Sequence, residues 1–238
     1  MKVEDFIKKL QFVCDECKTL YVMGCFGAPL NKTNKKRYKT NHVYNTSAVR
    51  QNMIEKATVD TFGFDCVNLI KGIMWGFVGD KTKTYGGAKY ATNNVPDVSA
   101  DGMIGICKEV KTNGWDNIVP GEAVWTKRHI GVYIGDGKVI ECSPKWSNNV
   151  QYSNLGNIKK YKTGHYRVWT KHGKFPFIEY NTNNKVNTSN INLEEIAKQV
   201  IAGKYGNGTT RKNNLKKAGY SDDEIKNIQN TVNKLLKK

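Results

Sequence analysis

The sequence has 238 residues, 39% hydrophobic and 25% charged, which is enough apolar material for a packed core and excludes a wholly disordered chain. Its 38 basic residues outnumber 21 acidic ones, and the net charge of +17 favours an anionic partner such as nucleic acid, a membrane surface or a cell wall with anionic polymers. We find no nucleic-acid-binding motif and no stretch as long as a membrane span, so neither a specific nucleic-acid partner nor a transmembrane segment is predicted.

The N-terminal part predicts a helix over residues 3–19. The first ten residues, MKVEDFIKKL, mix charged and apolar side chains, so we expect no signal peptide and synthesis in a cytoplasm. The six cysteines are irregularly spaced in a long chain, and we expect free thiols rather than a disulfide framework.

The central part predicts one apolar helix followed by strands. Residues 65–77, DCVNLIKGIMWGF, are apolar nearly all round and indicate a buried helix. From Glu122 onward the short runs AVW, HIGVYIG and KVIEC are separated by turn signals such as Asp136-Gly137. Helices followed by an antiparallel meander predict an α+β fold.

The composition changes near the end of the chain. Residues 181–190, NTNNKVNTSN, are almost purely polar and predict a linker. Three short helices are expected after it, the first capped by Asn192 and the third capped by Ser221 in a capping box with Glu224. The sequence therefore predicts a domain over residues 1–180 and a small all-α three-helix bundle over 191–238, whose size suits a binding module.

Cys66 is the first candidate for chemistry. It opens the apolar helix, where the helix dipole and free backbone N–H groups would stabilise a thiolate and later an oxyanion. A buried, inert cysteine is the alternative interpretation.

His129 and Glu141 are candidates to act with this thiol. His129 begins the run HIGVYIG, and a neutral histidine within reach of a cysteine forms a nucleophile–base pair. The turn at Asp136-Gly137 would bring Glu141 back beside His129, where a carboxylate fixes the imidazole tautomer. From spacing alone, the alternatives are a structural or surface role for His129 and an ion pair between Glu141 and a surface lysine.

Three motifs, taken in order, resemble the NlpC-type cysteine peptidases. They are YVMG at 21–24, FDC at 64–66 and RHIGVYIG at 128–135. The segments at 121–146 and 169–177 resemble more specifically a phage-lysin branch of that family. The resemblance implies a papain-like fold over residues 1–180 that cuts peptidoglycan stem peptides.

The resemblance also implies roles for individual residues. Cys66 would be the nucleophile, His129 the base and Glu141 the third polar residue, while Tyr21 and Asp65 would line the substrate site. The chain departs from common members at residues 67–68, where Val-Asn stands in place of Ser-Gly, and at the third polar position, which is often His, Asn or Gln.

The tail carries a separate resemblance, to a short three-helix cell-wall-binding repeat of some phage lysins that recognises the muropeptide. The matching core is IAxxVIAGKYGNGxxR. The residues implied as the contact loop are Tyr205, Gly206, Asn207, Gly208 and Arg211. A Gly-rich connection with a purely structural role is the alternative interpretation.

Other possible sites are weaker. Cys14 and Cys17 have the spacing of zinc ligands but no second pair follows, and His42, His165 and His172 show no ligand spacing, so we expect no metal and no cofactor. For His172 we expect a surface or packing role.

Together, the residues and resemblances predict an endolysin made in a bacterial host cytoplasm and acting on the cell wall after release. It would bind peptidoglycan and, through its basic surface, anionic wall polymers. The favoured activity is a D-glutamyl or isoglutaminyl endopeptidase. An N-acetylmuramoyl-L-alanine amidase, a non-catalytic wall-binding protein and, more weakly, a basic nucleic-acid binder are the alternatives.

Overall fold

The computed structural model describes residues 1–180, 188–218, 220 and 222–236. Its contacts divide the chain into two units, Met1–Tyr180 and Asn181–Lys238. The helices of the first unit are α1 (Val3–Asp15), α2 (Lys32–Tyr38), α3 (Ala48–Lys56), α4 (Cys66–Met74) and α5 (Ala100–Ile106), with the 3-10 turns η1 (Val43–Thr46), η2 (Trp115–Asn117) and η3 (Lys159–Tyr161). The strands of that unit are β1 (Thr19–Tyr21), β2 (Phe26–Pro29), β3 (Phe62–Phe64), β4 (Lys108–Lys111), β5 (Ala123–Thr126), β6 (His129–Gly135), β7 (Lys138–Ser143), β8 (Asn149–Leu155), β9 (Tyr166–Arg167) and β10 (Lys171–Lys174).

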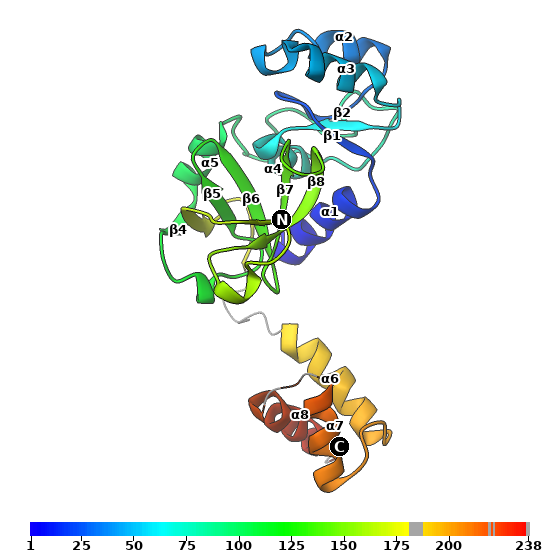
Figure 1. The fold of residues 1–238 in the computed structure, drawn as a ribbon, viewed down its shortest axis with the longest axis vertical. Helices are drawn as coiled ribbons and strands as arrows, with labels where there is room; N and C mark the ends of the chain where they lie inside the picture. Colours follow the sequence, from blue (N-terminus) through cyan, green and yellow to red (C-terminus); the bar gives the residue numbers. More distant parts are fainter. Residues whose placement is uncertain (181–187, 219, 221, 237–238) are drawn as a thin grey trace. The chain divides into compact units, whose positions relative to one another are not determined.

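The strands of residues 1–180 form two sheets, so the predicted α+β class is confirmed (Figure 1). The larger has the order β4-β10-β5-β6-β7-β8-β9, and the smaller has the order β1-β3-β2. Strands β5, β6 and β7 form the predicted antiparallel meander, and β8 extends it by one more antiparallel strand. The pairs β1–β3 and β8–β9 are parallel, which the sequence pattern did not indicate.

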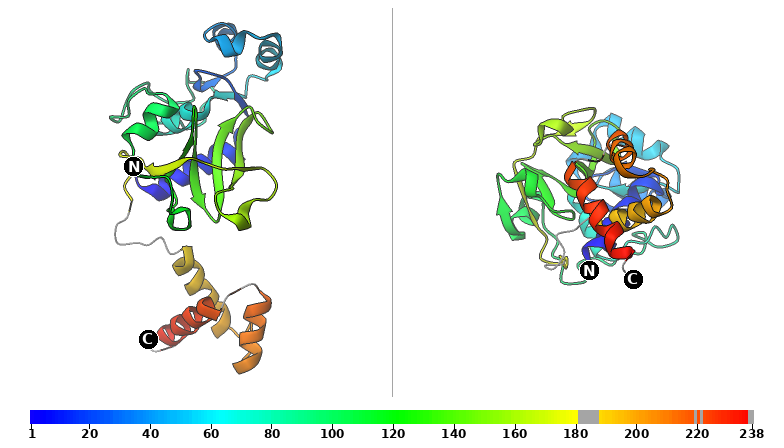
Figure 2. Two further views of the ribbon diagram at one scale, coloured as in Figure 1. Left: turned by 60° about the vertical axis from the view of Figure 1, so that its left-hand side comes forward. Right: turned by 90° about the horizontal axis from the view of Figure 1, so that it is seen from below.

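Helices α1 and α4 form the core against the larger sheet. Helix α4 contacts β6 and β7, and α1 contacts α4, β7 and β8 (Figure 2). The buried side chains of α1 recur at helical spacing, which is why this segment presents one apolar face: Val3, Phe6, Leu10 and Val13. The helix ends at Asp15, earlier than predicted, because Thr19 already belongs to β1.

The hairpin between β6 and β7 brings the predicted functional residues together. Asp136 has φ 47° and Gly137 has φ 70°, the left-handed pair that a tight two-residue hairpin turn requires. Gly131 permits close approach of the two strands, since a Cβ there would lie 3.2 Å from Cβ of Glu141. Glu141 is thereby held beside the first strand of the hairpin.

The second unit has three helices among its described residues, α6 (Thr188–Ile201), α7 (Gly208–Lys217) and α8 (Asp222–Leu235). They share a small apolar core made of Ile196, Ala197, Val200, Leu215, Ile228 and Val232. Asn192 lies within α6, so the prediction that it caps this helix was wrong. Thr, Ser and Asn cost too little free energy in a helix interior to determine where the helix begins. Of the predicted linker, residues 181–187 lie outside the described residues, as does the predicted cap Ser221.

The cysteines all lie within residues 1–180, and every one is a free thiol. Over the part of the chain that is described, no helix combines the length and the apolar character needed to cross a membrane.

Candidate active site

Cys66 is the first residue of α4 and lines a cleft. Its side chain is 6% exposed, and the cleft that it lines has a volume of about 900 Å³. The Sγ atom lies 3.9 Å from the carbonyl oxygen of Arg128, the residue that precedes His129. The fold therefore brings the thiol against the residue just before β6, 62 residues later in the sequence.

The surroundings of Cys66 keep its thiol protonated. Burial raises the pKa of this thiol to about 12, and the charge of Asp65 adds to the rise. The backbone N–H groups of Ile130 and Val67 and that of Cys66 lower the pKa but do not outweigh burial. The expected stabilisation of a thiolate at the helix N-terminus is thus present but insufficient, and the thiol needs a base to react.

His129 and Glu141 form a hydrogen-bonded pair. Nε2 of His129 lies 2.6 Å from Oε2 of Glu141, whose side chain is fully buried. Burial alone would raise the pKa of Glu141, but hydrogen bonds and charges from His129 and Arg167 lower it to about 2. An ionised carboxylate only accepts hydrogen bonds, so Nε2 carries the proton and, in the neutral imidazole, Nδ1 is left as the basic nitrogen.

Arg167 is a member of this site that the sequence reasoning missed. Its Nη2 and Nε atoms lie 2.8 and 3.1 Å from Oε2 of Glu141, and Ser153 donates a hydrogen bond of 2.5 Å to Oε1. Both carboxylate oxygens are therefore satisfied, as a buried charge requires. Arg167 is placed by the parallel pairing of β8 with β9, for which no local sequence signal exists.

Trp146 and Trp169 pack against the side chains of Arg167 and His129. The Trp169 ring stacks on His129 with centroids 5.5 Å apart and an interplanar angle of 13°. The Arg167 guanidinium lies 5.4 Å from the ring centres of both Trp146 and Trp169. These stacking contacts restrict the arginine and the imidazole to one orientation each.

Acid should destabilise the protein through Glu141. Because the folded-state pKa of Glu141 is lowered, its stabilisation is fully present above the ordinary value of 4.5 and is lost as the pH falls toward about 2. We expect this loss to be about 3 kcal/mol in the free energy of unfolding, measured by urea denaturation between pH 6 and pH 2.5. Glu141→Gln should show a smaller decline over this range than the exposed-site control Glu16→Gln; equal declines would contradict the prediction.

Asp65 caps helix α4 and also touches the cleft. Its Oδ1 accepts from the backbone N–H of Asn68 at 2.8 Å, and its Oδ2 accepts from the Gly24 N–H at 2.8 Å and the Asn68 side chain at 2.6 Å. The carboxylate therefore fixes the start of the helix that carries Cys66. Burial raises the pKa of Asp65, opposed by these hydrogen bonds.

Removing the Asp65 carboxylate should destabilise this unit. Asp65→Ala loses a helix cap and leaves the side-chain amide of the buried Asn68 without this acceptor, and we expect a cost of about 2 to 3 kcal/mol in the free energy of unfolding. Asp65→Asn keeps one acceptor oxygen and should cost less. Urea denaturation of both variants tests this, and a wild-type midpoint for Asp65→Ala would show that the cap is dispensable.

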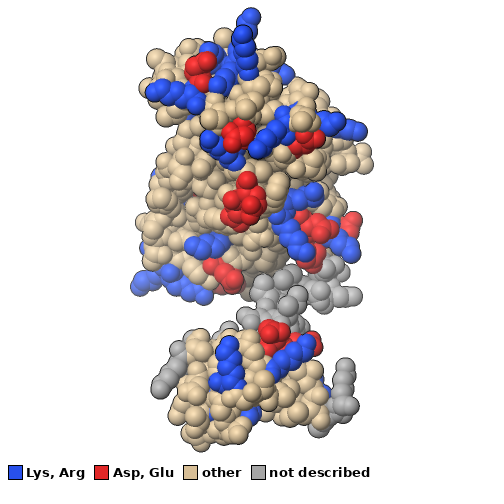
Figure 3. Space-filling view, turned by 90° about the vertical axis from the view of Figure 1, so that its right-hand side faces the viewer, with Lys and Arg blue, Asp and Glu red and all other residues tan. Residues whose placement is uncertain are grey.

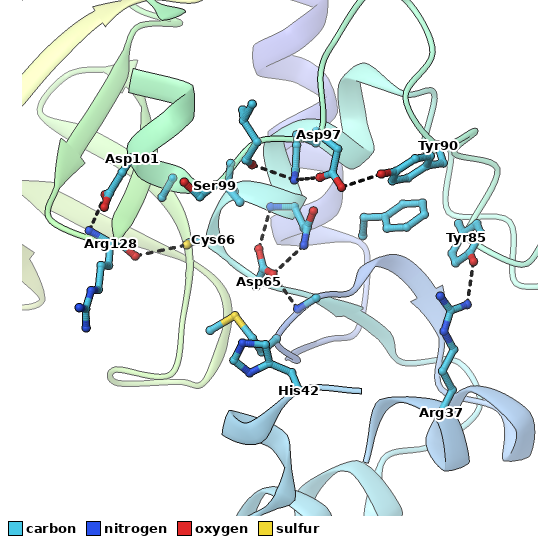
Figure 4. Close-up of a pocket in the computed structure, with 18 residues that line it drawn as sticks. Arg37, His42, Asp65, Cys66, Tyr85, Tyr90, Asp97, Ser99, Asp101 and Arg128 are labelled. Carbon is cyan, nitrogen blue, oxygen red and sulfur yellow. Dashed lines mark hydrogen bonds and ion pairs between the residues drawn. The ribbon is translucent and has the colours of Figure 1, made fainter. Parts of the chain in front are cut away.

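The cleft walls come from segments on both sides of Cys66. Figure 4 shows Asp101 and Arg128 on one side of the thiol, and Arg37, Tyr85 and Tyr90 toward the other. Oδ1 of Asp101 accepts hydrogen bonds from the Arg128 backbone N–H at 2.8 Å and from Trp125 at 2.9 Å, and it thereby holds the turn before His129.

Tyr21, the other predicted substrate-lining residue, is not among the residues that line this cleft. Its side chain is 5% exposed and packs against Tyr44. Burial raises its pKa, and the nearby Cys66 adds to the rise. Tyr21 is thus close to the thiol but part of the core behind it.

The predicted wall-contact loop in the tail is held together internally. Arg211 donates to the Gly206 carbonyl at 3.0 Å, to the Asn207 side chain at 2.9 Å and to Gln229 of α8 at 3.0 Å. Gly208 and Arg211 line a groove of about 620 Å³ between α7 and α8, whereas Tyr205, Gly206 and Asn207 are not among its lining residues.

The residues that we judged weaker candidates have structural contacts. His172 is buried, with Nδ1 2.5 Å from Glu122 and Nε2 2.8 Å from the Asn113 carbonyl, which is a packing role. Within the described residues no group of three or more His, Cys, Asp or Glu side chains could hold a metal ion.

The tail matches a known repeat. A family model described as the CW_7 repeat matches residues 194–236. Among solved structures, the chain is similar to the P60 domain of an antigen from M. avium subspecies paratuberculosis, at 16% identity and a TM-score of 0.38, over 75% of this chain and 96% of that one. No curated protein matches the sequence. The repeat supports the prediction of a cell-wall-associated protein at a coarse level, and it covers less than half of the chain.

Proposed function

We propose that this protein is a peptidoglycan hydrolase of phage-lysin type. A papain-like cysteine hydrolase unit, residues 1–180, would be joined to a three-helix wall-binding unit. We favour cleavage of the D-glutamyl or isoglutaminyl amide of the stem peptide. The observation that carries the proposal is the buried thiol of Cys66, which lines a cleft and lies against the residue before a His129–Glu141 pair.

In the first step the thiol forms an acyl-enzyme. Nδ1 of His129 takes the proton from Sγ of Cys66, and the sulfur attacks the amide carbonyl carbon of the peptide. Backbone N–H groups at the start of α4 are available to stabilise the oxyanion. The C–N bond then breaks, His129 returns its proton to the leaving amine, and a thioester remains on Cys66.

In the second step water releases the product. His129 takes a proton from water, the hydroxide oxygen attacks the thioester carbon, and the C–S bond breaks. The sulfur regains the proton from His129, and the peptide leaves with a new carboxyl group. Throughout, Glu141 holds the Nε2 proton and stabilises the imidazolium that forms between transfers.

The tail would hold the enzyme on its insoluble substrate. Supporting this is the CW_7 match over residues 194–236, and attachment to the wall raises the local concentration of cleavable bonds. On the face seen in Figure 3, Lys and Arg side chains are scattered with Asp and Glu beside them rather than gathered into one patch. We therefore propose that the net charge of +17 assists attachment to anionic polymers without providing specificity.

Mass spectrometry of digested walls tests the proposal. New amino termini at the residue that follows D-glutamate or isoglutamine indicate an endopeptidase. Free lactyl groups on muramic acid together with new L-Ala amino termini would instead identify the amidase alternative. Wall binding without any new termini would support the non-catalytic alternative and contradict the proposed hydrolase.

A further inference from the structure

The end of the cleft away from Arg128 carries an arginine, Arg37, at the C-terminal end of α2. Its Nη1 donates a hydrogen bond of 2.8 Å to the Tyr85 hydroxyl (Figure 4). The guanidinium carbon lies 5.8 Å from the ring centre of Tyr85 and 5.4 Å from that of the buried Tyr38. Tyr85 is in turn stacked on Phe26 at 4.1 Å, so the groups that orient Arg37 are themselves fixed by the core.

Arg37 and Arg128 are the two cleft-lining cations that no carboxylate neutralises, and of these two only Arg37 has its guanidinium held by a hydrogen bond and by aromatic rings. Lys71 is paired with Asp97 and also donates to the Val98 carbonyl. No ion pair within residues 1–180 involves Arg37. The hydrogen bond to Tyr85 raises the pKa of Arg37, so its charge is permanent.

The acids that line the cleft are engaged elsewhere. Asp65 caps α4, Asp97 holds Lys71 and Tyr90, and Asp101 holds the backbone of Arg128. Arg37 therefore presents a guanidinium with unused N–H groups, already oriented, at the wall of the cleft that contains the candidate nucleophile. A planar guanidinium with free N–H groups binds a carboxylate with two parallel hydrogen bonds.

We propose that Arg37 is a recognition site for a free carboxylate of the peptide in the cleft, with Tyr85 as the residue that positions it. Given the proposed function, on which this identification of the ligand rests, the carboxylate belongs to the peptidoglycan stem peptide. Two carboxylates have this chemistry, the α-carboxylate of D-glutamate and the C-terminal carboxylate. Amidation of either one removes its charge, which makes the two distinguishable.

Binding to three synthetic peptides tests the site. The peptides are L-Ala-γ-D-Glu-L-Lys-D-Ala with both carboxylates free, the same peptide with D-isoglutamine, and the same peptide with a C-terminal amide. Calorimetry with the full chain carrying Cys66→Ala measures affinity without turnover. We expect one of the two amidations to weaken binding about 10- to 100-fold, the range for hydrogen bonds to a charged partner.

Substitutions then assign the effect to Arg37. In Arg37→Gln the free peptide should bind as weakly as the amidated one, Arg37→Lys should retain part of the preference, and Tyr85→Phe should reduce it. Lys36→Gln removes an exposed charge from the same helix, outside the cleft, and should keep the full preference. Equal binding of all three peptides by the parent, or an undiminished preference in Arg37→Gln, would overturn the assignment.

Hydrolysis of the same peptides and of purified walls is measured separately with the wild-type chain. If no peptide and no wall preparation is cut but the binding preference depends on Arg37, the proposed hydrolase fails while the carboxylate site stands. If walls are cut but binding ignores amidation, the carboxylate site fails while the hydrolase stands.

Discussion

Replacing Cys66 with alanine is expected to lower the rate of wall solubilisation by at least about 10³-fold, because the reaction loses its nucleophile. Turbidity loss of purified walls gives the rate, and sedimentation with walls gives binding. Binding should be unchanged, since the CW_7 match lies in residues 194–236. Cys107→Ala is the matched control, because this half-buried thiol does not line the cleft and its loss should leave the rate near wild type.

His129→Ala is expected to be as inactive as Cys66→Ala. With burial raising the pKa of the thiol to about 12, almost no thiolate exists at neutral pH, so Cys66 depends on a base to lose its proton. When two residues act in the same step, removing either one abolishes that step. The double variant with Cys66→Ala and His129→Ala should therefore be no less active than either single variant. A Cys66→Ala protein that clears walls at the wild-type rate would contradict the proposed mechanism.

The hairpin and the helix pattern were predictable because they depend on local sequence. The pair Asp136-Gly137 favours a tight turn, and that turn alone brings Glu141 back to His129. In the same way, the apolar run after Asp65 predicted α4. Each of these features is determined by side chains a few residues apart.

The rest of the site depends on contacts that no local pattern encodes. Arg167 reaches Glu141 through a parallel strand pair, and Asp101 reaches the Arg128 turn from the start of α5. Arg37 comes to the cleft on α2, a short helix rich in lysine whose sequence indicates only a solvated surface. In the tail, Arg211 was predicted as a ligand contact, yet it makes three hydrogen bonds within its own unit.

Arg167 and Glu141 should shift the pH dependence of activity in opposite directions. Glu141 shares its Oε2 between His129 and Arg167, so the positive charge of Arg167 offsets part of the carboxylate's effect on the imidazole. In Arg167→Met the whole carboxylate charge acts on His129 and favours the imidazolium, which cannot accept the thiol proton. We expect the acid limb of kcat/KM to move to higher pH.

Glu141→Gln should move that limb to lower pH, because the imidazolium loses its counter-ion. It should also lower kcat by about 10²- to 10⁴-fold, since an amide no longer fixes the Nε2 proton. Besides Glu141 on β7 and Arg167 on β9, two titratable groups face the turn before β6: Asp101 on α5, which accepts from the Arg128 backbone N–H, and Cys66 on α4, whose pKa is raised by burial. Arg167→Lys keeps the charge while losing the two-point contact, so its acid limb should stay near that of the wild type. A purely structural arginine would lower activity equally at all pH values in Arg167→Met, and that outcome would show that Arg167 does not tune the base.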